Sequence, residues 1–215
     1  HQDSIAVTDW YMDSHSCTTD SRPGFKYDGK LILTEESRLS QIPYRALLPQ
    51  GVDNLLVPVC LSATHIAWGA IRLEPVFLST GEAAGYAAAL AKQQGTTPAD
   101  LNPDLLLKTL VRRRQLVSFF NDLKVNDSDP AIPAAQYFAT KGFFNDYNAR
   151  LNEPLTQAVR EVWERGLRQL EQGTLNPHQL ASKVQQAEEQ KSPTSGETRG
   201  TFLLKARRRI EPRSS

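Results

Sequence analysis

The sequence predicts an α/β region over residues 1–125, followed by an all-α region over residues 126–215. Three observations predict this order. Short apolar runs typical of strands lie in the first third of the chain, and a long helical pattern rich in small residues follows them. Beyond the turn-forming run NDSDP, only helical periodicity remains. With 215 residues, the chain is long enough to bury a substantial core.

Strand-like runs come first. SIAVTDWYM and KLILTEES each read as a short strand with a polar continuation. Pro49, Gly51 and Asp53 then mark a turn, and residues 55–61 follow as an expected buried strand. Because Pro58 lacks a backbone N–H, we expect this strand to be bent or to lie at a sheet edge.

The long helix has Pro75 in its first turn and stops near Gly95, two positions that favour these residues. Gly81, Gly85 and Ala89 recur every fourth residue and form one smooth stripe. Each glycine costs about 1 kcal/mol relative to alanine in an exposed helix. The stripe therefore predicts that a sheet or a bound cofactor approaches the helix closely.

Helical patterns continue to the end of the chain. NPDLLLKTLVRRRQLV comes before the expected boundary, and IPAAQYFATKGFF, EPLTQAVREVWERGLRQLEQG, NPHQLASKVQQAEEQ and TRGTFLLKARRRI come after it. The run KSPTSGE reads as a flexible link between the last two.

Composition and charge exclude several classes of protein. The net charge is +1, and the basic tail KARRRIEPRSS is typical of a last helical turn, so we expect no nucleic-acid partner. Arg72, Glu74 and Glu82 interrupt the longest apolar region, so no membrane span is expected. Two cysteines make neither a metal site nor a disulfide framework, and pairing of Cys17 with Cys60 stays open.

Known phosphate, zinc and nucleophile motifs are missing, which leaves the segment THIAWGAIRLEP as the best candidate site. A strand that ends there and continues as a helix directs free backbone N–H groups at whatever lies against it. Gly69 permits unusual backbone angles, and Ala70 and Ile71 leave their amides unobstructed. Such a turn suits an anionic or electron-rich ligand, although many similar turns only hold a fold together.

The segment IPYRALLPQGVDNLLVPVCLSATHIAWGAIRLEPVFLSTGEAAGYAAALA closely resembles the C-terminal part of a family of bacterial FAD-dependent oxidoreductases. DWYMDSH resembles a second stretch of these proteins, and AAQYFATKGFFNDYNARLNEPLTQAVREVW looks like a helical extension that some members carry. The resemblance implies FAD as the cofactor. It also implies a two-part FAD-binding domain, of which this sequence holds the C-terminal strand–turn–helix portion without the GxGxxG unit.

Site residues follow from the resemblance. Gly69, Ala70, Ile71 and Arg72 fall on the turn that faces the pyrimidine edge of the flavin in such proteins, where preorganised N–H groups stabilise charge. His65 is the candidate general acid or base, with capping of the strand end as the alternative. Arg72 is a second catalytic candidate, which would offset flavin charge or clamp an acidic substrate, and its alternative is a salt bridge to Glu74 or another acid.

Three further side chains are candidates for substrate contact. His15 lies in the run MDSH, and Tyr44 and Arg45 lie in IPYR. A structural role is the alternative for all three, as packing beneath the sheet in the case of Tyr44 and Arg45.

We therefore expect the C-terminal piece of a flavin-dependent enzyme that transfers hydride from an unknown organic substrate. The start at His1, with Met12 as the only methionine, favours a fragment or processed piece. Its expected partners are a small-molecule substrate and the missing N-terminal nucleotide-binding portion, without which we expect FAD to bind poorly. The compartment stays open, secreted and periplasmic locations included. The alternative function is a non-enzymatic helical interaction module on an inactive flavoprotein remnant.

Overall fold

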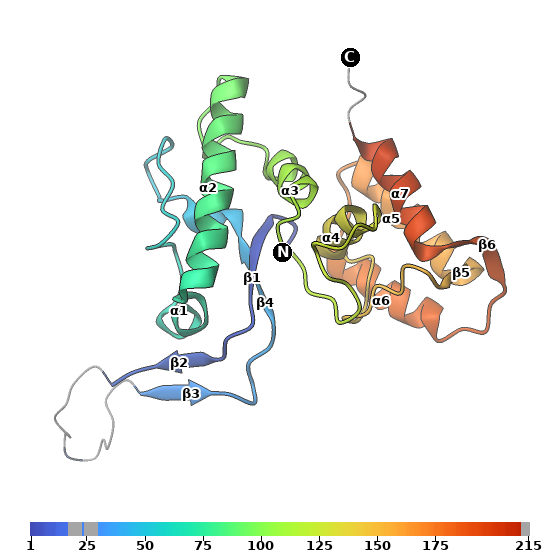
Figure 1. Ribbon diagram of the computed structural model, residues 1–215, viewed down its shortest axis with the longest axis horizontal. Helices are drawn as coiled ribbons and strands as arrows, with labels where there is room; N and C mark the ends of the chain where they lie inside the picture. The colour runs from blue at the N-terminus through green and yellow to red at the C-terminus, as the bar shows by residue number, and fades with distance from the viewer. Residues whose placement is uncertain (17–22, 24–29, 212–215) are drawn as a thin grey trace. The chain divides into compact units, whose positions relative to one another are not determined.

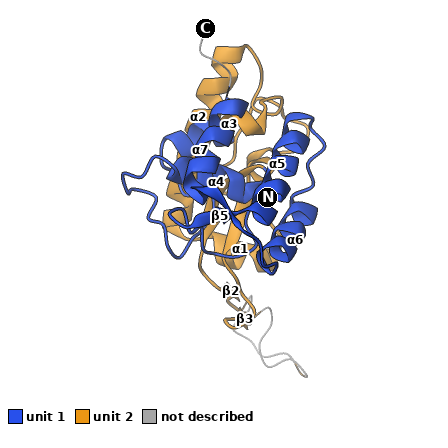
Figure 2. Ribbon diagram, turned by 90° about the vertical axis from the view of Figure 1, so that its right-hand side faces the viewer, with its two compact units in different colours: residues 1–2, 107–215 blue, residues 3–106 orange. Residues whose placement is uncertain are grey.

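The computed structural model describes residues 1–16, 23 and 30–211 (Figure 1). The chain divides into two compact units, which Figure 2 shows in different colours. We call residues 3–106 the α/β unit, and residues 1–2 with 107–215 the helical unit. This division falls earlier than the change of character expected after residue 125, because residues 107–125 belong with the helices that follow.

The α/β unit begins with two antiparallel strand pairs. Strand β1 pairs with β4, and β2 pairs with β3. Their bounds are Ser4–Thr8 (β1), Met12–Ser14 (β2), Leu31–Leu33 (β3) and Ser40–Pro43 (β4), and a 3-10 turn, η1, covers Tyr44–Leu47. Ile5, Ala6, Ile42 and Leu47 are almost fully buried, so this corner supplies much of the unit's core.

Two helices follow, α1 over His65–Ile71 and α2 over Glu74–Gln94. As expected, Pro75 lies in the first turn of α2, and Gly95 ends the helix with a φ of 64°. Alanines such as Ala83 and Ala87 are fully buried on the side of α2 that packs toward β1. A third helix, α3 (Pro103–Arg112), crosses the division between the units.

The strand expected at residues 55–61 does not form. Val57 donates its N–H to the carbonyl of Leu47, and no strand is assigned to this segment. Leu55 and Val59 are each 47% exposed, and the run reaches the core at its last residue, Leu61. Pro58 removes a donor from the middle of the run, which weakens any ladder that it could join.

The stripe of small residues on α2 also differs from the expectation. A Cβ atom built on Gly81 or Gly85 would meet nothing within 4 Å, and Ala89 is exposed. Within the described part of the α/β unit, neither a sheet nor any other segment approaches these two glycines. The buried side of α2 is the neighbouring alanine face.

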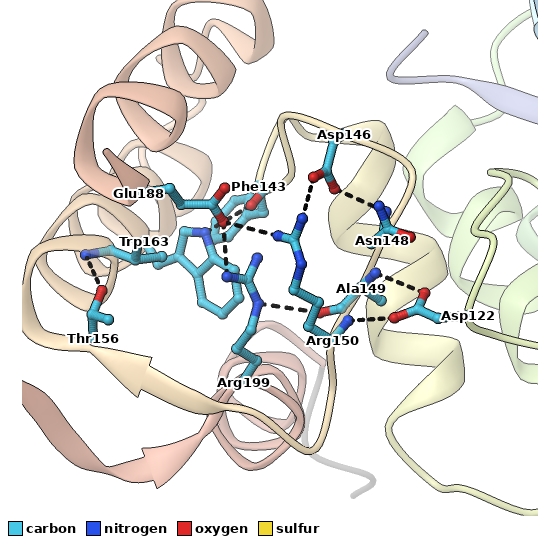
Figure 3. Close-up of polar contacts among 11 residues, drawn as sticks. Asp122, Phe143, Asp146, Asn148, Ala149, Arg150, Thr156, Trp163, Glu188 and Arg199 are labelled. Carbon is cyan, nitrogen blue, oxygen red and sulfur yellow. Dashed lines mark hydrogen bonds and ion pairs between the residues drawn. The ribbon is translucent and has the colours of Figure 1, made fainter. Parts of the chain in front are cut away.

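The helical unit contains four further helices and one short strand pair. The helices are α4 (Ile132–Thr140), α5 (Gln157–Glu171), α6 (Pro177–Glu188) and α7 (Arg199–Ile210). Strand β5 (Pro154–Thr156) pairs antiparallel with β6 (Thr194–Thr198), so the unit is not entirely helical and the expected link KSPTSGE is partly a strand. Trp163 is fully buried at the centre and donates its indole N–H to the carbonyl of Phe143 at 2.7 Å (Figure 3).

A search of the described residues for membrane-spanning segments found no helix with both the length and the apolar character required.

Candidate functional site

One cluster of polar side chains lies where α1 packs on β2. We call it the β2–α1 cluster, and it consists of Asp13, Ser14, His15, His65 and Arg72. Strand β2 places the first two at its end, with His15 directly after it, and α1 places His65 at its first position with Arg72 directly after its last turn. The cluster unites residues more than fifty positions apart in the sequence.

Helix α1 starts early because Thr64 caps it. The Thr64 side-chain oxygen accepts the N–H of Ala67, which satisfies one of the free donors of the first turn. The helix therefore begins at His65, inside the segment that the sequence predicted to be an open turn.

The contact between α1 and β2 is exceptionally close because Gly69 has no side chain. A Cβ atom at this position would lie 1.9 Å from the backbone oxygen of Asp13. The Thr8 hydroxyl donates to the carbonyl of Ala70 at 2.5 Å, which ties the same face of α1 to the end of β1. These two contacts fix the strand against the helix through backbone atoms.

Asp13 carries the charge that organises the cluster. Its Oδ1 accepts a hydrogen bond from Arg72 Nη2 at 2.9 Å, and its Oδ2 lies 4.0 Å from His15 Nε2. The Asp13 side chain is only 14% exposed, whereas that of His15 is 83% exposed. The ion pair with Arg72 is thus partly shielded from water, and His15 lies on the open side of it.

Ser14 and His65 form the shortest polar contact in the cluster. Ser14 Oγ lies 2.6 Å from His65 Nε2. Both side chains are accessible, and an imidazole nitrogen can accept or donate a proton, so this pair is suited to exchanging a proton with a bound molecule.

The four residues expected to face the flavin do not form a helix-opening turn. Gly69, Ala70 and Ile71 lie inside α1, and the Arg72 N–H donates to the carbonyl of Trp68 at 3.0 Å. The expectation of free amides near residue 72 is therefore wrong. The assignment of these residues as flavin ligands stays a prediction, without the geometry that was expected to support it.

The amides that open α2 are also largely used. Val76 and Phe77 both donate their N–H groups to the carbonyl of Leu73, and Pro75 has none to offer. The start of α2 does not replace the expected set of N–H groups.

Tyr44 and Arg45 have structural partners. The Tyr44 side chain is buried, and its hydroxyl donates to the carbonyl of Pro98 at 2.8 Å. Burial raises the pKa of Tyr44 to about 12. Arg45 forms an ion pair with Asp3 at 2.5 Å. The packing alternative describes Tyr44 correctly, and neither residue is placed in the β2–α1 cluster by these contacts.

Ser14 is the residue that the sequence analysis missed. It lies between Asp13 and His15 in the run DSH, which was considered only for its charged members. A serine next to a histidine candidate in a short strand is a weak signal, because its partner, His65, is known only once the fold is known.

The helical unit contains a second polar cluster, which Figure 3 shows in detail. Arg199 is 6% exposed, stacks over Trp163 at 4.9 Å, and donates to Glu188 at 2.8 Å. Arg150 lies near the same carboxylate at 3.7 Å and also pairs with Asp146. The members neutralise one another around a buried tryptophan, so this cluster holds three segments of the unit together.

Cys17, whose pairing with Cys60 was left open, lies outside the described residues. Cys60 itself is exposed rather than part of the core. Among residues 1–16, 23 and 30–211, no group of three His, Cys, Asp or Glu side chains could hold a metal ion.

Comparison with known proteins gives one match. Residues 1–111 match the family model described as FAD dependent oxidoreductase. The match covers just over half of the chain, so the chain belongs to the FAD-dependent oxidoreductase family, whose cofactor is FAD. No curated protein and no solved structure matched. All five residues of the β2–α1 cluster lie inside the matched region, and most of the helical unit lies beyond it.

The described residues do not by themselves fit a flavin-binding surface of the expected kind. The amides of the α1–α2 junction are engaged, and the backbone of Gly69 is pressed against Asp13. What the structure does offer is the set of accessible acid–base side chains of the β2–α1 cluster.

Proposed function

We propose that this chain works in a flavin-dependent enzyme that transfers hydride between an organic substrate and FAD, and that the β2–α1 cluster lies on the substrate side. The observation that carries the proposal is the 2.6 Å contact between Ser14 and His65, within the region that matches the family. FAD supplies the hydride acceptor. The chain supplies the group that removes a proton.

Oxidation of an alcohol or amine carbon releases a proton as well as a hydride. His65 is the side chain of the cluster best suited to take this proton, because a neutral imidazole has one unprotonated ring nitrogen. Arg72 is less suited to bind an acidic substrate, because its Nη2 already forms an ion pair with Asp13 Oδ1 at 2.9 Å. The salt-bridge alternative for Arg72 is favoured by this contact.

The nucleotide-binding portion is part of the same proposal. A GxGxxG unit, which this sequence lacks, binds the adenosine and pyrophosphate parts of FAD in proteins of this architecture. We place that unit elsewhere in the same protein. A small-molecule substrate would then lie between that portion and the β2–α1 cluster.

The test uses the whole flavin-loaded protein. Sugars, polyols and organic acids are screened for those that bleach the flavin absorbance, and the bleaching rate is measured for His65→Gln beside wild type. We expect a loss of about 10²- to 10⁴-fold, the usual contribution of a general acid or base. His178→Gln is the control, because His178 is an exposed histidine of the helical unit. Equal rates in H65Q and wild type would remove His65 from the mechanism.

The alternative, a helical interaction module on an inactive remnant, has one supporting observation. The engaged amides of α1 leave the expected flavin contacts unmade. A whole protein that binds no flavin in the same experiment would favour this alternative.

A further inference from the structure

Among the described residues, the Ser14 hydroxyl has two hydrogen-bond neighbours, and it carries a single proton. Its Oγ lies 2.6 Å from His65 Nε2 and 3.3 Å from the backbone carbonyl oxygen of His15. A carbonyl oxygen can only accept a hydrogen bond, whereas the imidazole nitrogen accepts or donates according to its tautomer. The two contacts together therefore indicate which ring nitrogen of His65 carries the proton.

Only one tautomer satisfies both contacts. If neutral His65 carries its proton on Nδ1, Ser14 must donate to Nε2 and has no proton left for the His15 carbonyl. If His65 carries its proton on Nε2, that N–H donates to Ser14 Oγ, and Ser14 donates onward to His15. The second arrangement makes two hydrogen bonds where the first makes one.

The geometry points to Ser14 as a positioning residue that holds His65 in the Nε2–H tautomer and leaves Nδ1 as the nitrogen that exchanges a proton with the substrate. The role in catalysis rests on the proposed function, whereas the tautomer does not. In the oxidative direction the substrate O–H or N–H bond breaks, its electron pair stays on the substrate, and the proton binds Nδ1. The hydride would go to FAD, which would serve as the oxidant when bound to the whole protein.

The same hydrogen bond survives the transfer. Protonated His65 carries hydrogens on both ring nitrogens, so Nε2–H continues to donate to Ser14 while Nδ1 holds the new proton. The ring therefore keeps its orientation in both protonation states. In a hydrolase triad, a carboxylate orients the histidine and fixes its tautomer. Here the Ser14 hydroxyl would do the same for His65.

The surroundings keep Ser14 in place. Gly69 allows β2 to lie directly on α1, and Arg72 holds Asp13, the residue before Ser14. The other charged or titratable groups of the cluster are Asp13, His15 and Arg72. The Asp13 carboxylate forms an ion pair with Arg72 and lies 4.0 Å from His15. Ser14 is the group in hydrogen-bond contact with His65 Nε2.

Nitrogen-15 NMR of the imidazole rings in the 215-residue chain tests this directly. Spectra are recorded at a pH where the ring signals no longer change, and the His65 signals are identified by their loss in H65Q. We expect a protonated, pyrrole-type Nε2 and an unprotonated, pyridine-type Nδ1. A pyridine-type Nε2 would overturn the inference, because Ser14 would then be the donor.

Two variants extend the test. In Ser14→Ala the ratio of the two His65 tautomers should shift toward Nδ1–H by about fivefold, the value of one ordinary hydrogen bond. Ser14→Thr keeps a hydroxyl on a residue that strands accept and should restore the wild-type ratio. The ratio at exposed His178 should stay constant in all variants. An unchanged His65 ratio in S14A also overturns the inference, and a pyridine-type Nε2 in the wild-type spectrum overturns it even if S14A does not fold. Since no turnover is measured, failure of the proposed enzyme function would leave these spectra unaffected.

Discussion

Replacing Gly69 with alanine tests the contact on which the β2–α1 cluster depends. The new Cβ would lie 1.9 Å from the Asp13 oxygen, 2.7 Å from its nitrogen and 2.8 Å from its carbonyl carbon. All three are backbone atoms, so no side-chain rotation relieves the overlap. Strand and helix must separate by about 1 Å, against the Thr8 hydroxyl bond and the Arg72 ion pair that hold them.

The expected cost follows from two opposing terms. Overpacking of this kind costs about 1 to 3 kcal/mol, and the upper end applies because backbone lies on both sides. Alanine in place of glycine within a helix raises the stability of the helix by about 1 kcal/mol. We therefore expect Gly69→Ala to lower the free energy of unfolding of the α/β unit by about 2 kcal/mol. Separation of the two elements should also lengthen the contact between Ser14 and His65.

Gly81→Ala is the matched control. Gly81 also lies inside a helix, but a Cβ atom there meets nothing within 4 Å. It should raise the free energy of unfolding by up to about 1 kcal/mol, so the two variants should differ by about 3 kcal/mol. Urea unfolding followed by circular dichroism gives both values, and amide hydrogen exchange in α1 locates the effect. Equal stability of G69A and G81A would show that α1 does not lie on β2 as described.

Two other changes have defined outcomes. The pKa of Tyr44 in the folded chain is about 12, above its ordinary value, so its neutral form stabilises the fold below pH 10 and this contribution is lost between pH 10 and 12. In Tyr44→Phe, the fall in unfolding free energy over that interval should be smaller than in wild type by about 2 kcal/mol, and parallel curves would exclude the effect. Glu188→Gln leaves Arg199 buried without its charged partner and should cost about 3 kcal/mol by urea unfolding. The Arg160–Glu164 pair is half-exposed, so Glu164→Gln should lower the free energy of unfolding by under about 1 kcal/mol, and similar losses in both variants would contradict the burial argument.

Helix ends could be predicted from the sequence, because they depend on the residues at the ends themselves. The helix between Pro75 and Gly95 was predictable, because proline suits the first turn and glycine adopts the left-handed conformation that ends a helix. The structure adds two side-chain caps of the kind that a sequence can indicate, Thr156 before α5 and Asn176 before α6, which the sequence analysis did not name. These signals need no knowledge of distant parts of the chain.

Errors arose where a distant partner decides the outcome. Residues 55–61 have the composition of a strand, but a strand forms only against a neighbour, and Val57 instead reaches the carbonyl of Leu47. Thr64 was not considered as a helix cap, so residues 65–71 were predicted to be a turn although they form helix α1. The pairing of His65 with Ser14 has no local signal at all.

The surroundings of Gly69 differ from those of the two glycines in α2. At Gly69 the sequence predicted unusual backbone angles, but this residue lies inside helix α1, and its missing side chain admits the chain's own strand β2. Gly81 and Gly85, where a close neighbour was expected, have none within 4 Å in the described unit. A glycine therefore predicts a close approach only when the surface it faces is known. For this family member, the consequence is that the chemistry of the matched region is better sought in the side chains that Gly69 brings together, His65 and Ser14 above all, than in the amides beside it.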